Sequence, residues 1–239
     1  MTYNYPDVHL RTFIEAGSRD VLESVLQRVY GWMALGLFTT ASVAAFATAS
    51  SSVQVLISQP IIIFGLLLIE LALVLGITWS LKRISTAAAL VLFFIYAALN
   101  GLTLSGLFAV YALGSIAYSF LASAVLFGIM SIIGYTTKIN LSKMSSFLLT
   151  GILGLLIAMV VNLFWANSTL EWIVTFAGIL FFLGLTIFDT QRIRRMTATA
   201  LKQGDEDFEA HLGILGALSL YLEFVNLFLF LLRFSWRRR

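Results

Sequence analysis

The sequence predicts an all-α polytopic membrane protein whose chain crosses the bilayer with about seven helices. Apolar residues make up 60% of the 239 residues and charged residues only 11%, whereas soluble domains have about 45–50% and about 25%. The apolar residues gather in long stretches, and most basic residues fall between alternate stretches. Lipid offers backbone groups no hydrogen-bond partner, so such stretches must be helices.

Seven stretches are long enough to cross about 30 Å of hydrocarbon, which takes about 20 apolar residues. In chain order they cover residues 30–50, 56–79, 87–109, 115–134, 144–165, 170–189 and 211–234. They are too long and too uniformly apolar for the strands of a membrane barrel, which have about 10 residues.

Polar residues mark where these spans begin and end along the chain. Residues 1–29 lack the basic start and short apolar core of a cleaved signal peptide, so they predict a polar tail, partly an amphipathic helix, before the first span. The second span ends before Lys82 and Arg83, and the fourth ends before Lys138. The sixth ends at Asp189, and the polar stretch 204–207 predicts the turn into the seventh. One membrane domain, residues 30–239, is expected after the tail.

The basic residues predict the orientation. Eleven of the fifteen lie in the tail and in alternate loops: Arg11, Arg19, Arg28, Lys82, Arg83, Lys138, Lys143, Arg192, Arg194, Arg195 and Lys202. The loops near Ser51, Gly114 and Ala166 hold none. Cytoplasmic loops are enriched in Lys and Arg, so the N-terminus is expected in the cytoplasm. Seven crossings place the C-terminus outside, against the tendency of its terminal arginines, but upstream loops usually dominate.

Four residues qualify as charges at membrane depth: Glu70, Asp189, Glu223 and Arg233. A charge near the centre of a membrane helix costs at least about 2.5–3.5 kcal/mol on insertion scales, so each is a candidate functional residue. The structural alternative is that these residues pair to tie helices together. Arg233, near a helix end, could also extend its side chain to water.

Asp189 and Glu223 are the sharpest candidates. Both are 17 residues from residue 206 in the predicted turn, so on antiparallel helices they lie at similar depth. Two carboxylates a few ångströms apart share a proton and titrate as a pair, which predicts a pH sensor. The alternative is that Asp189 caps its helix or faces cytoplasmic water beside Arg192.

Asparagines and histidines give weaker signals. Asn100, Asn162 and Asn226 lie within spans, where an amide more often joins helices than lines a pathway. Asn100 and Asn226 are the candidates for lining a pathway. His9 and His211 lie in or beside polar segments and are expected to be solvated.

The residue inventory predicts no enzyme. There is no His-Glu-x-x-His zinc motif, no cysteine, and no histidine at membrane depth to activate a serine. Asp189 and Glu223 could form an aspartyl protease dyad, but neither lies in the glycine-flanked context of such proteases. The lack of cysteine also excludes disulfides and thiolate metal sites.

Four segments of the chain resemble the Bax inhibitor-1 family, also called the transmembrane Bax inhibitor motif family, in its bacterial form. They are LQRVYGWMALGLFTTA (Leu26–Ala41), LNGLTLS (Leu99–Ser105), IFDTQRI (Ile187–Ile193) and SLYLEFVNLFLFLLRF (Ser219–Phe234). The resemblance implies six helices around a central, C-terminal seventh, and a pH-sensitive calcium leak into the cytosol.

The resemblance also implies roles for single residues. Asp189 and Glu223 match the family's di-aspartyl pH sensor, and Glu70 and Arg233 match an acid and a base that pair towards the outer side. Lys82 or Arg83 would supply the basic residue that latches the sensor. The family commonly has Asp where this chain has Glu223, and the longer side chain changes the geometry of the pair.

The expected ligands are calcium ions and protons in a lipid bilayer, with no resident cofactor and no nucleic acid. Calcium prefers oxygen ligands, and Glu70, Asp189 and Glu223 could bind it transiently, as a leak requires. Two alternatives stay open: a non-conducting regulator of cell death or of a membrane protease, and a proton-coupled exchanger. A bacterial plasma membrane is the expected location.

Overall fold

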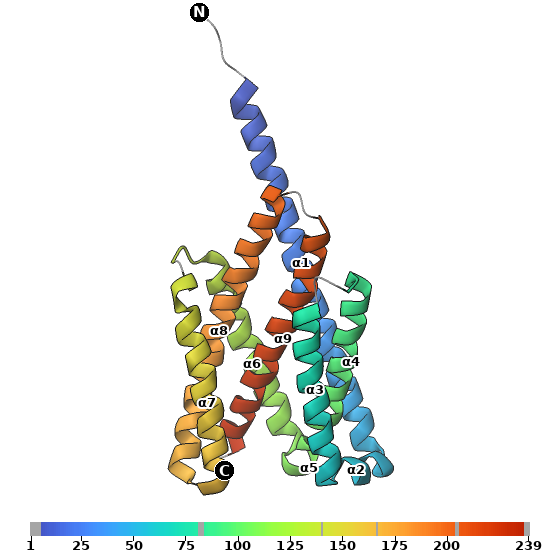
Figure 1. Cartoon of the computed structure of the whole chain (residues 1–239). Helices are drawn as coiled ribbons and strands as arrows, with labels where there is room; N and C mark the ends of the chain where they lie inside the picture. The colour runs from blue at the N-terminus through green and yellow to red at the C-terminus, as the bar shows by residue number, and fades with distance from the viewer. Residues whose placement is uncertain (1–5, 81–83, 140, 166, 204–205, 237–239) are drawn as a thin grey trace, which may run out of the picture.

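The protein is a bundle of long helices (Figure 1). The computed structural model describes residues 6–80, 84–139, 141–165, 167–203 and 206–236, and no strand occurs in that part of the chain. The helices are α1 (Pro6–Ala49), α2 (Ser51–Ile57), α3 (Pro60–Ser80), α4 (Thr86–Ser105), α5 (Leu107–Val110), α6 (Leu113–Thr136), the short 3₁₀ helix η1 (Leu141–Met144), α7 (Ser145–Trp165), α8 (Ser168–Gln203) and α9 (Glu206–Trp236).

Seven segments of the described chain are long and apolar enough to cross a membrane. They are Leu22–Ala49, Pro60–Ser80, Thr86–Val110, Leu113–Thr136, Ser145–Asn162, Ser168–Ala200 and His211–Ser235. Each of them overlaps one of the seven predicted spans, which confirms the predicted fold class. We call the end of the bundle at which α1 enters the N-terminal end, and the opposite end, where α9 finishes, the C-terminal end (Figure 1).

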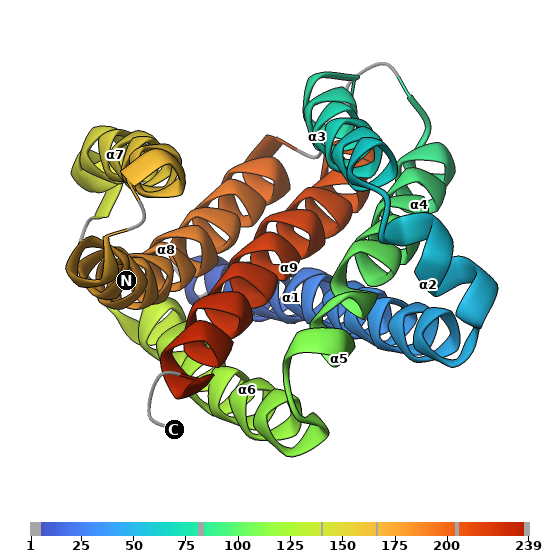
Figure 2. The same cartoon turned by 90° about the horizontal axis from the view of Figure 1, so that it is seen from below.

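Helix α9 forms the core of the bundle. Seen from the C-terminal end, it runs obliquely through the middle, with α1, α6 and α8 beside it (Figure 2). It packs mainly on α8, α1, α6 and α4, whereas α3 packs mainly on α4 and α7 mainly on α8. Four helices therefore contact the central helix extensively, and the other two of the predicted six lie further out.

Local sequence explains where several helices begin. The Ser85 side chain accepts a hydrogen bond from the Ala88 amide and caps α4, as serine does at helix N-termini. The Asn167 side chain accepts from the amides of Thr169 and Leu170 and caps α8. Pro60 opens α3, where proline's missing N–H has no cost.

Two helices extend past the predicted limits. Helix α1 is continuous from Pro6 through residue 30, and Val25 and Val29 are buried in the core, so the packed domain begins before residue 30. Helix α8 continues 14 residues beyond Asp189, to Gln203. Arginine is a good helix former, so this helix can continue where its apolar stretch ends.

Glycines allow two pairs of helices to approach closely. A methyl group added at Gly101 of α4 would lie 2.6 Å from the Thr40 carbonyl oxygen of α1. One added at Gly134 of α6 would lie 2.6 Å from the Ile187 carbonyl oxygen of α8. Helices with small residues at their contact pack in this way in membranes.

Candidate functional site: a buried carboxyl pair and a polar network

The structure brings Asp189 of α8 and Glu223 of α9 together. The Glu223 carboxyl lies within hydrogen-bonding reach of the side chains of Asp189 and Thr186. Glu223 is only 4% exposed, whereas the Asp189 side chain is 15% exposed. The two acids therefore meet as their spacing predicted, and their role as a pH sensor stays a prediction.

One oxygen of this pair stands out, because the described residues offer it no hydrogen-bond partner. The buried Oε2 atom of Glu223 makes no hydrogen bond to any described residue. A buried polar atom without a partner is costly, and more so when it carries charge. A proton, a water molecule or a cation at this oxygen would relieve that cost.

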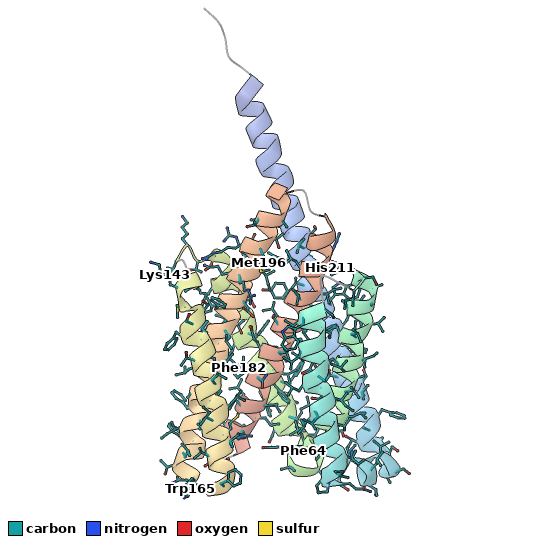
Figure 3. The ribbon with its side chains drawn as sticks, in the orientation of Figure 1. Phe64, Lys143, Trp165, Phe182, Met196 and His211 are labelled. Carbon is teal, nitrogen blue, oxygen red and sulfur yellow. The ribbon has the colours of Figure 1, made fainter. Side chains whose placement is uncertain are left out.

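A cavity lies beside Asp189, towards the N-terminal end of the bundle. Its volume is about 140 Å³, and Thr78 of α3 lines it together with residues of α8 and α9, among them Asp189, Arg192 and Ser219. Along α8, Asp189 is midway between Phe182 and Met196, which lie in the middle of the bundle and near its N-terminal end (Figure 3). Arg192 Nη1 lies 3.8 Å from Asp189 Oδ1, so Asp189 contacts both Glu223 and the neighbouring base.

Glu70 belongs to a separate polar network. Its carboxylate accepts hydrogen bonds from Asn100 Nδ2 at 3.2 Å and from Thr103 Oγ1 at 2.5 Å. Both donors lie on α4, so these bonds join α3 to α4. Glu70 and Asn100 are each 7% exposed, which places an acid and an amide deep in the protein.

The network continues to the central helix through Tyr221. The Tyr221 hydroxyl donates to Asn100 Oδ1 at 3.2 Å and lies 2.7 Å from Thr40 Oγ1. Thr40, on α1, also lies within hydrogen-bonding distance of the Ala97 carbonyl oxygen. Four helices, α1, α3, α4 and α9, are thus joined by hydrogen bonds between buried side chains.

The expected pair of Glu70 and Arg233 is not formed in the structure. Arg233 places its guanidinium 5.9 Å from the centre of the Phe230 ring, and Glu70 has the two partners on α4. The two residues lie at different depths. Helix α3 begins at Pro60, at the C-terminal end of the bundle, and Glu70 is 10 residues further along it, a rise of about 15 Å. Arg233 lies in the last turn of α9, at the C-terminal end itself. The two side chains are therefore at different levels.

The other predicted site residues have varied surroundings. Asn226 donates to the Leu222 carbonyl oxygen of its own helix, and Asn162 accepts from the Asn167 amide. Neither Asn100 nor Asn226 lines the cavity beside Asp189. Lys82 and Arg83, the predicted latch residues, lie outside the described residues.

The three acids do not form one metal site. Within the described part of the chain, no group of three or more His, Asp or Glu side chains is close enough to hold a metal ion. Asp189 and Glu223 stand together, and Glu70 is bound to Asn100 and Thr103. Any cation at the pair would need additional ligands from backbone carbonyls, hydroxyls or water.

The sequence interpretation missed Tyr221, Thr40 and Thr103. A signal for Tyr221 was present, because a tyrosine hydroxyl inside a membrane span needs a hydrogen-bond partner. Thr40 and Thr103 gave no comparable signal, since a threonine hydroxyl can donate to a carbonyl oxygen of its own helix. The Thr40 hydroxyl also lies within hydrogen-bonding distance of the Gly36 carbonyl oxygen.

Comparison with known proteins places this arrangement in a family. The family described as "Inhibitor of apoptosis-promoting Bax1" matches residues 22–238. The inner membrane protein YbhL of Escherichia coli (strain K12) is 41% identical over 219 residues, which are 91% of this chain and 93% of that protein. An uncharacterized protein of Borreliella burgdorferi is 39% identical over 216 residues, 90% of this chain and 92% of that protein.

A third relative is more distant. An uncharacterized membrane protein of Streptococcus pyogenes serotype M3 is 35% identical over 219 residues, which are 90% of this chain and 93% of that protein. These relatives are bacterial, and the family match over residues 22–238 extends over all seven spans. The chain is an integral membrane protein that belongs to the Bax inhibitor-1 family.

Proposed function

We propose that this protein is a pH-sensitive calcium leak pathway, gated by the carboxyl pair of Asp189 and Glu223. The observation that carries the proposal is the contact between these acids across α8 and α9, with one Glu223 oxygen buried and without a hydrogen-bond partner in the described part of the chain. Perturbed, buried acid pairs gather at functional sites.

The pair supplies a gate because its charge depends on pH. With one shared proton, a carboxyl donates to a carboxylate and holds α8 against α9. When the pH rises and that proton is lost, two like charges face each other in surroundings of low dielectric. The helices then separate, or a cation enters to compensate the charge.

The cavity beside Asp189 supports access from one side of the membrane. Asp189, Arg192 and Ser219 give it a polar wall, so water and hydrated ions can approach the pair from the N-terminal end. Calcium accepts carboxylate, carbonyl and water oxygens in flexible arrangements. Two carboxylates would bind it weakly, which suits an ion that must also leave. With the N-terminal end in the cytoplasm of a bacterial plasma membrane, this cavity is the inner mouth.

Calcium entry into liposomes tests the proposal. The purified protein is reconstituted with a calcium dye inside, and flux is measured between about pH 5 and 8, the range expected for a perturbed carboxylate pair. Internal and external pH are matched. We expect the wild-type flux to change across this range, and Asp189→Asn and Glu223→Gln to flatten the profile.

Glu223→Asp is the matched variant, because it keeps the acid and shortens its side chain. It should retain the pH dependence with a shifted midpoint. If Asp189→Asn and Glu223→Gln fold and keep the wild-type profile, the acid pair is not the sensor. A wild-type protein without flux at any pH would contradict the leak and favour the non-conducting regulator, and flux that requires a proton gradient would favour the exchanger.

A further inference from the structure

A second pocket, with both polar and apolar side chains in its lining, lies between α8 and the start of α7, near the N-terminal end of the bundle. Its volume is about 300 Å³, and its lining residues are Ser145, Phe188, Gln191, Arg192, Arg195 and Met196. Two arginines, one amide and one hydroxyl thus share a pocket with the apolar side chains of Phe188 and Met196. Apart from Arg192, which also lines the cavity beside Asp189, the residues of this pocket have no part in the proposed gate.

The polar wall of the pocket is held in place by hydrogen bonds. Gln191 is 4% exposed, and its Nε2 donates to the Ile139 carbonyl oxygen at 2.7 Å. Its Oε1 accepts from the Leu141 amide and from Arg195 Nη2. The bonds to Ile139 and Leu141 fix the connection before α7 to α8, and the third bond holds the guanidinium of Arg195 beside Gln191 on α8.

The pocket opens where a bilayer surface would lie. Lys143, at the start of the α7 region, and Met196 of α8 both lie near the N-terminal end, whereas Trp165 marks the opposite end of α7 (Figure 3). Helix α7 packs mainly on α8, and Phe147 in its first turn is 68% exposed. The pocket is therefore bordered by a lipid-facing apolar surface and by basic side chains.

These features fit one ligand chemistry. Guanidinium groups bind phosphate oxygens through paired hydrogen bonds, and basic pockets between membrane helices bind anionic lipid headgroups. The apolar residues next to the arginines match the acyl chains that follow such a headgroup. A free phosphate ion would use the arginines and leave the apolar surface without a role.

We infer that an anionic phospholipid binds between α7 and α8, with its headgroup phosphate at Arg192 and Arg195. Arg192 also lines the cavity beside Asp189 and lies 3.8 Å from that acid, and its side chain is 59% exposed. The lipid therefore competes with Asp189 for Arg192. This regulatory part rests on the proposed leak function, whereas the binding site itself does not.

Native mass spectrometry of the detergent-purified protein tests the binding. Phosphatidylglycerol is titrated against wild type, Arg192→Gln and Arg195→Gln, with phosphatidylcholine as the neutral lipid. Losing one basic contact should weaken phosphatidylglycerol binding about fivefold. Arg28→Gln is the matched control, because it removes one exposed positive charge from α1 outside the pocket, and it should leave the affinity unchanged.

Three results would overturn the site. They are equal weakening by Arg28→Gln and Arg192→Gln, phosphatidylcholine binding as tight as phosphatidylglycerol binding, and complete displacement of the lipid by millimolar inorganic phosphate. The first would indicate a general surface attraction, the second a site without charge recognition, and the third a site for the free anion.

Calcium flux tests the regulation. Calcium flux is measured in liposomes of rising phosphatidylglycerol content, with internal and external pH matched and held constant. Flux through the wild type and through Arg28→Gln should change with the lipid content, whereas flux through Arg192→Gln should not. An unchanged lipid response of Arg192→Gln would overturn the competition. Absence of flux in every lipid would instead contradict the proposed leak, and the binding measurement would still decide the site.

Discussion

Tyr221 joins the central helix α9 to α1 and α4 by hydrogen bonds. Its hydroxyl contacts Asn100 and Thr40, and its side chain is fully buried. Its ring also meets the edges of Phe93 and Tyr96, with centroids 5.6 and 5.7 Å away. Hydrogen bonds fix its position and ring packing fixes its orientation.

Replacing Tyr221 by Phe should destabilise the protein while preserving the ring contacts. Asn100 loses a donor and Thr40 a partner in a place that water does not reach, which costs about 1–2 kcal/mol. Thermal unfolding in detergent measures the loss. Tyr96→Phe is the control, because the Tyr96 hydroxyl makes no hydrogen bond to the described residues, and it should cost less. Equal effects of the two changes would mean that the network does not stabilise the fold.

The Glu70 network gives a second prediction at this scale. Glu70→Gln and Thr103→Val should be coupled, because Thr103 donates to the Glu70 carboxylate, and contacting residues show interaction energies of about 0.5–3 kcal/mol. Glu70→Gln and Arg233→Met should be additive within about 0.5 kcal/mol, as distant sites are. Double-mutant cycles of unfolding free energy measure both. Strong coupling between Glu70 and Arg233 would contradict this prediction and support the ion pair expected from the family resemblance.

Sequence reasoning identified the acids but only some of their partners. Equal distance from one turn was enough to bring Asp189 and Glu223 together, because two antiparallel helices with one short turn have a fixed register. Glu70 has no such constraint, since its depth on α3 and its rotation toward α4 depend on packing. The contacts with Asn100 and Thr103 therefore required the structure.

Helix α6 shows how one element is fitted to the bundle. Small side chains recur along its buried face, namely Ser115, Ser119, Ser123 and Ser131, with Phe127 between the last two, and Gly134 continues that face to the contact with α8. The hydroxyls of Ser119 and Ser131 are buried without a partner among the described residues. Small residues bring helix backbones close together in membranes, so this face serves packing.

Gly134→Ala should separate α6 from α8. Its added methyl group would lie 2.6 Å from the Ile187 carbonyl oxygen and 2.9 Å from Thr190 Cβ, and overpacking of this kind costs about 1–3 kcal/mol. Gly128→Ala on the same helix is the control, because nothing lies within 4 Å of its methyl group. It should be neutral or raise stability, since alanine favours helix. Thermal unfolding that ranks the two variants the other way would contradict the close contact.

The seven membrane spans could be predicted from composition, but the ends of their helices could not. The apolar stretches predicted all seven spans because lipid enforces helices of a fixed minimum length. Once a helix leaves the hydrocarbon, water and neighbouring helices satisfy its polar groups, so its length is no longer limited by the bilayer. Helix α8 therefore continues through its arginines to Gln203.

At the scale of the whole molecule, the connections alternate between the two ends of the bundle. The α6–α7 connection lies at the N-terminal end, whereas the α5–α6 connection and the end of α9 lie at the opposite end (Figure 1). The odd number of spans thus separates the two termini, as the full crossing of the last span requires. The side on which each end lies remains a prediction from the basic residues.

Labelling of single cysteines tests that orientation. The chain has no cysteine, so one introduced at Lys138 or at Gly114, both exposed, is the sole target of an impermeant thiol reagent. Cysteine at 138 should react only after the membrane is broken and the reagent reaches its cytoplasmic face. Cysteine at 114 should react in intact cells or spheroplasts. The reverse labelling pattern would mean that the protein has the opposite orientation, with the cavity beside Asp189 on the outer side of the membrane.

The continuity of α9 has a mechanical consequence. The helix has 31 residues, a length of about 46 Å, and Tyr221 stands at its middle, tied to α1 and α4. A rigid rod held at its centre turns more readily than it slides. Glu223 is two residues from that pivot, so a small displacement there is magnified at both ends. A tilt of about 10° would move each end by about 4 Å in opposite directions, given the rise per residue. In the proposed gate, a proton gained or lost at Glu223 would act near the fulcrum of this lever and would alter both ends of the bundle at once.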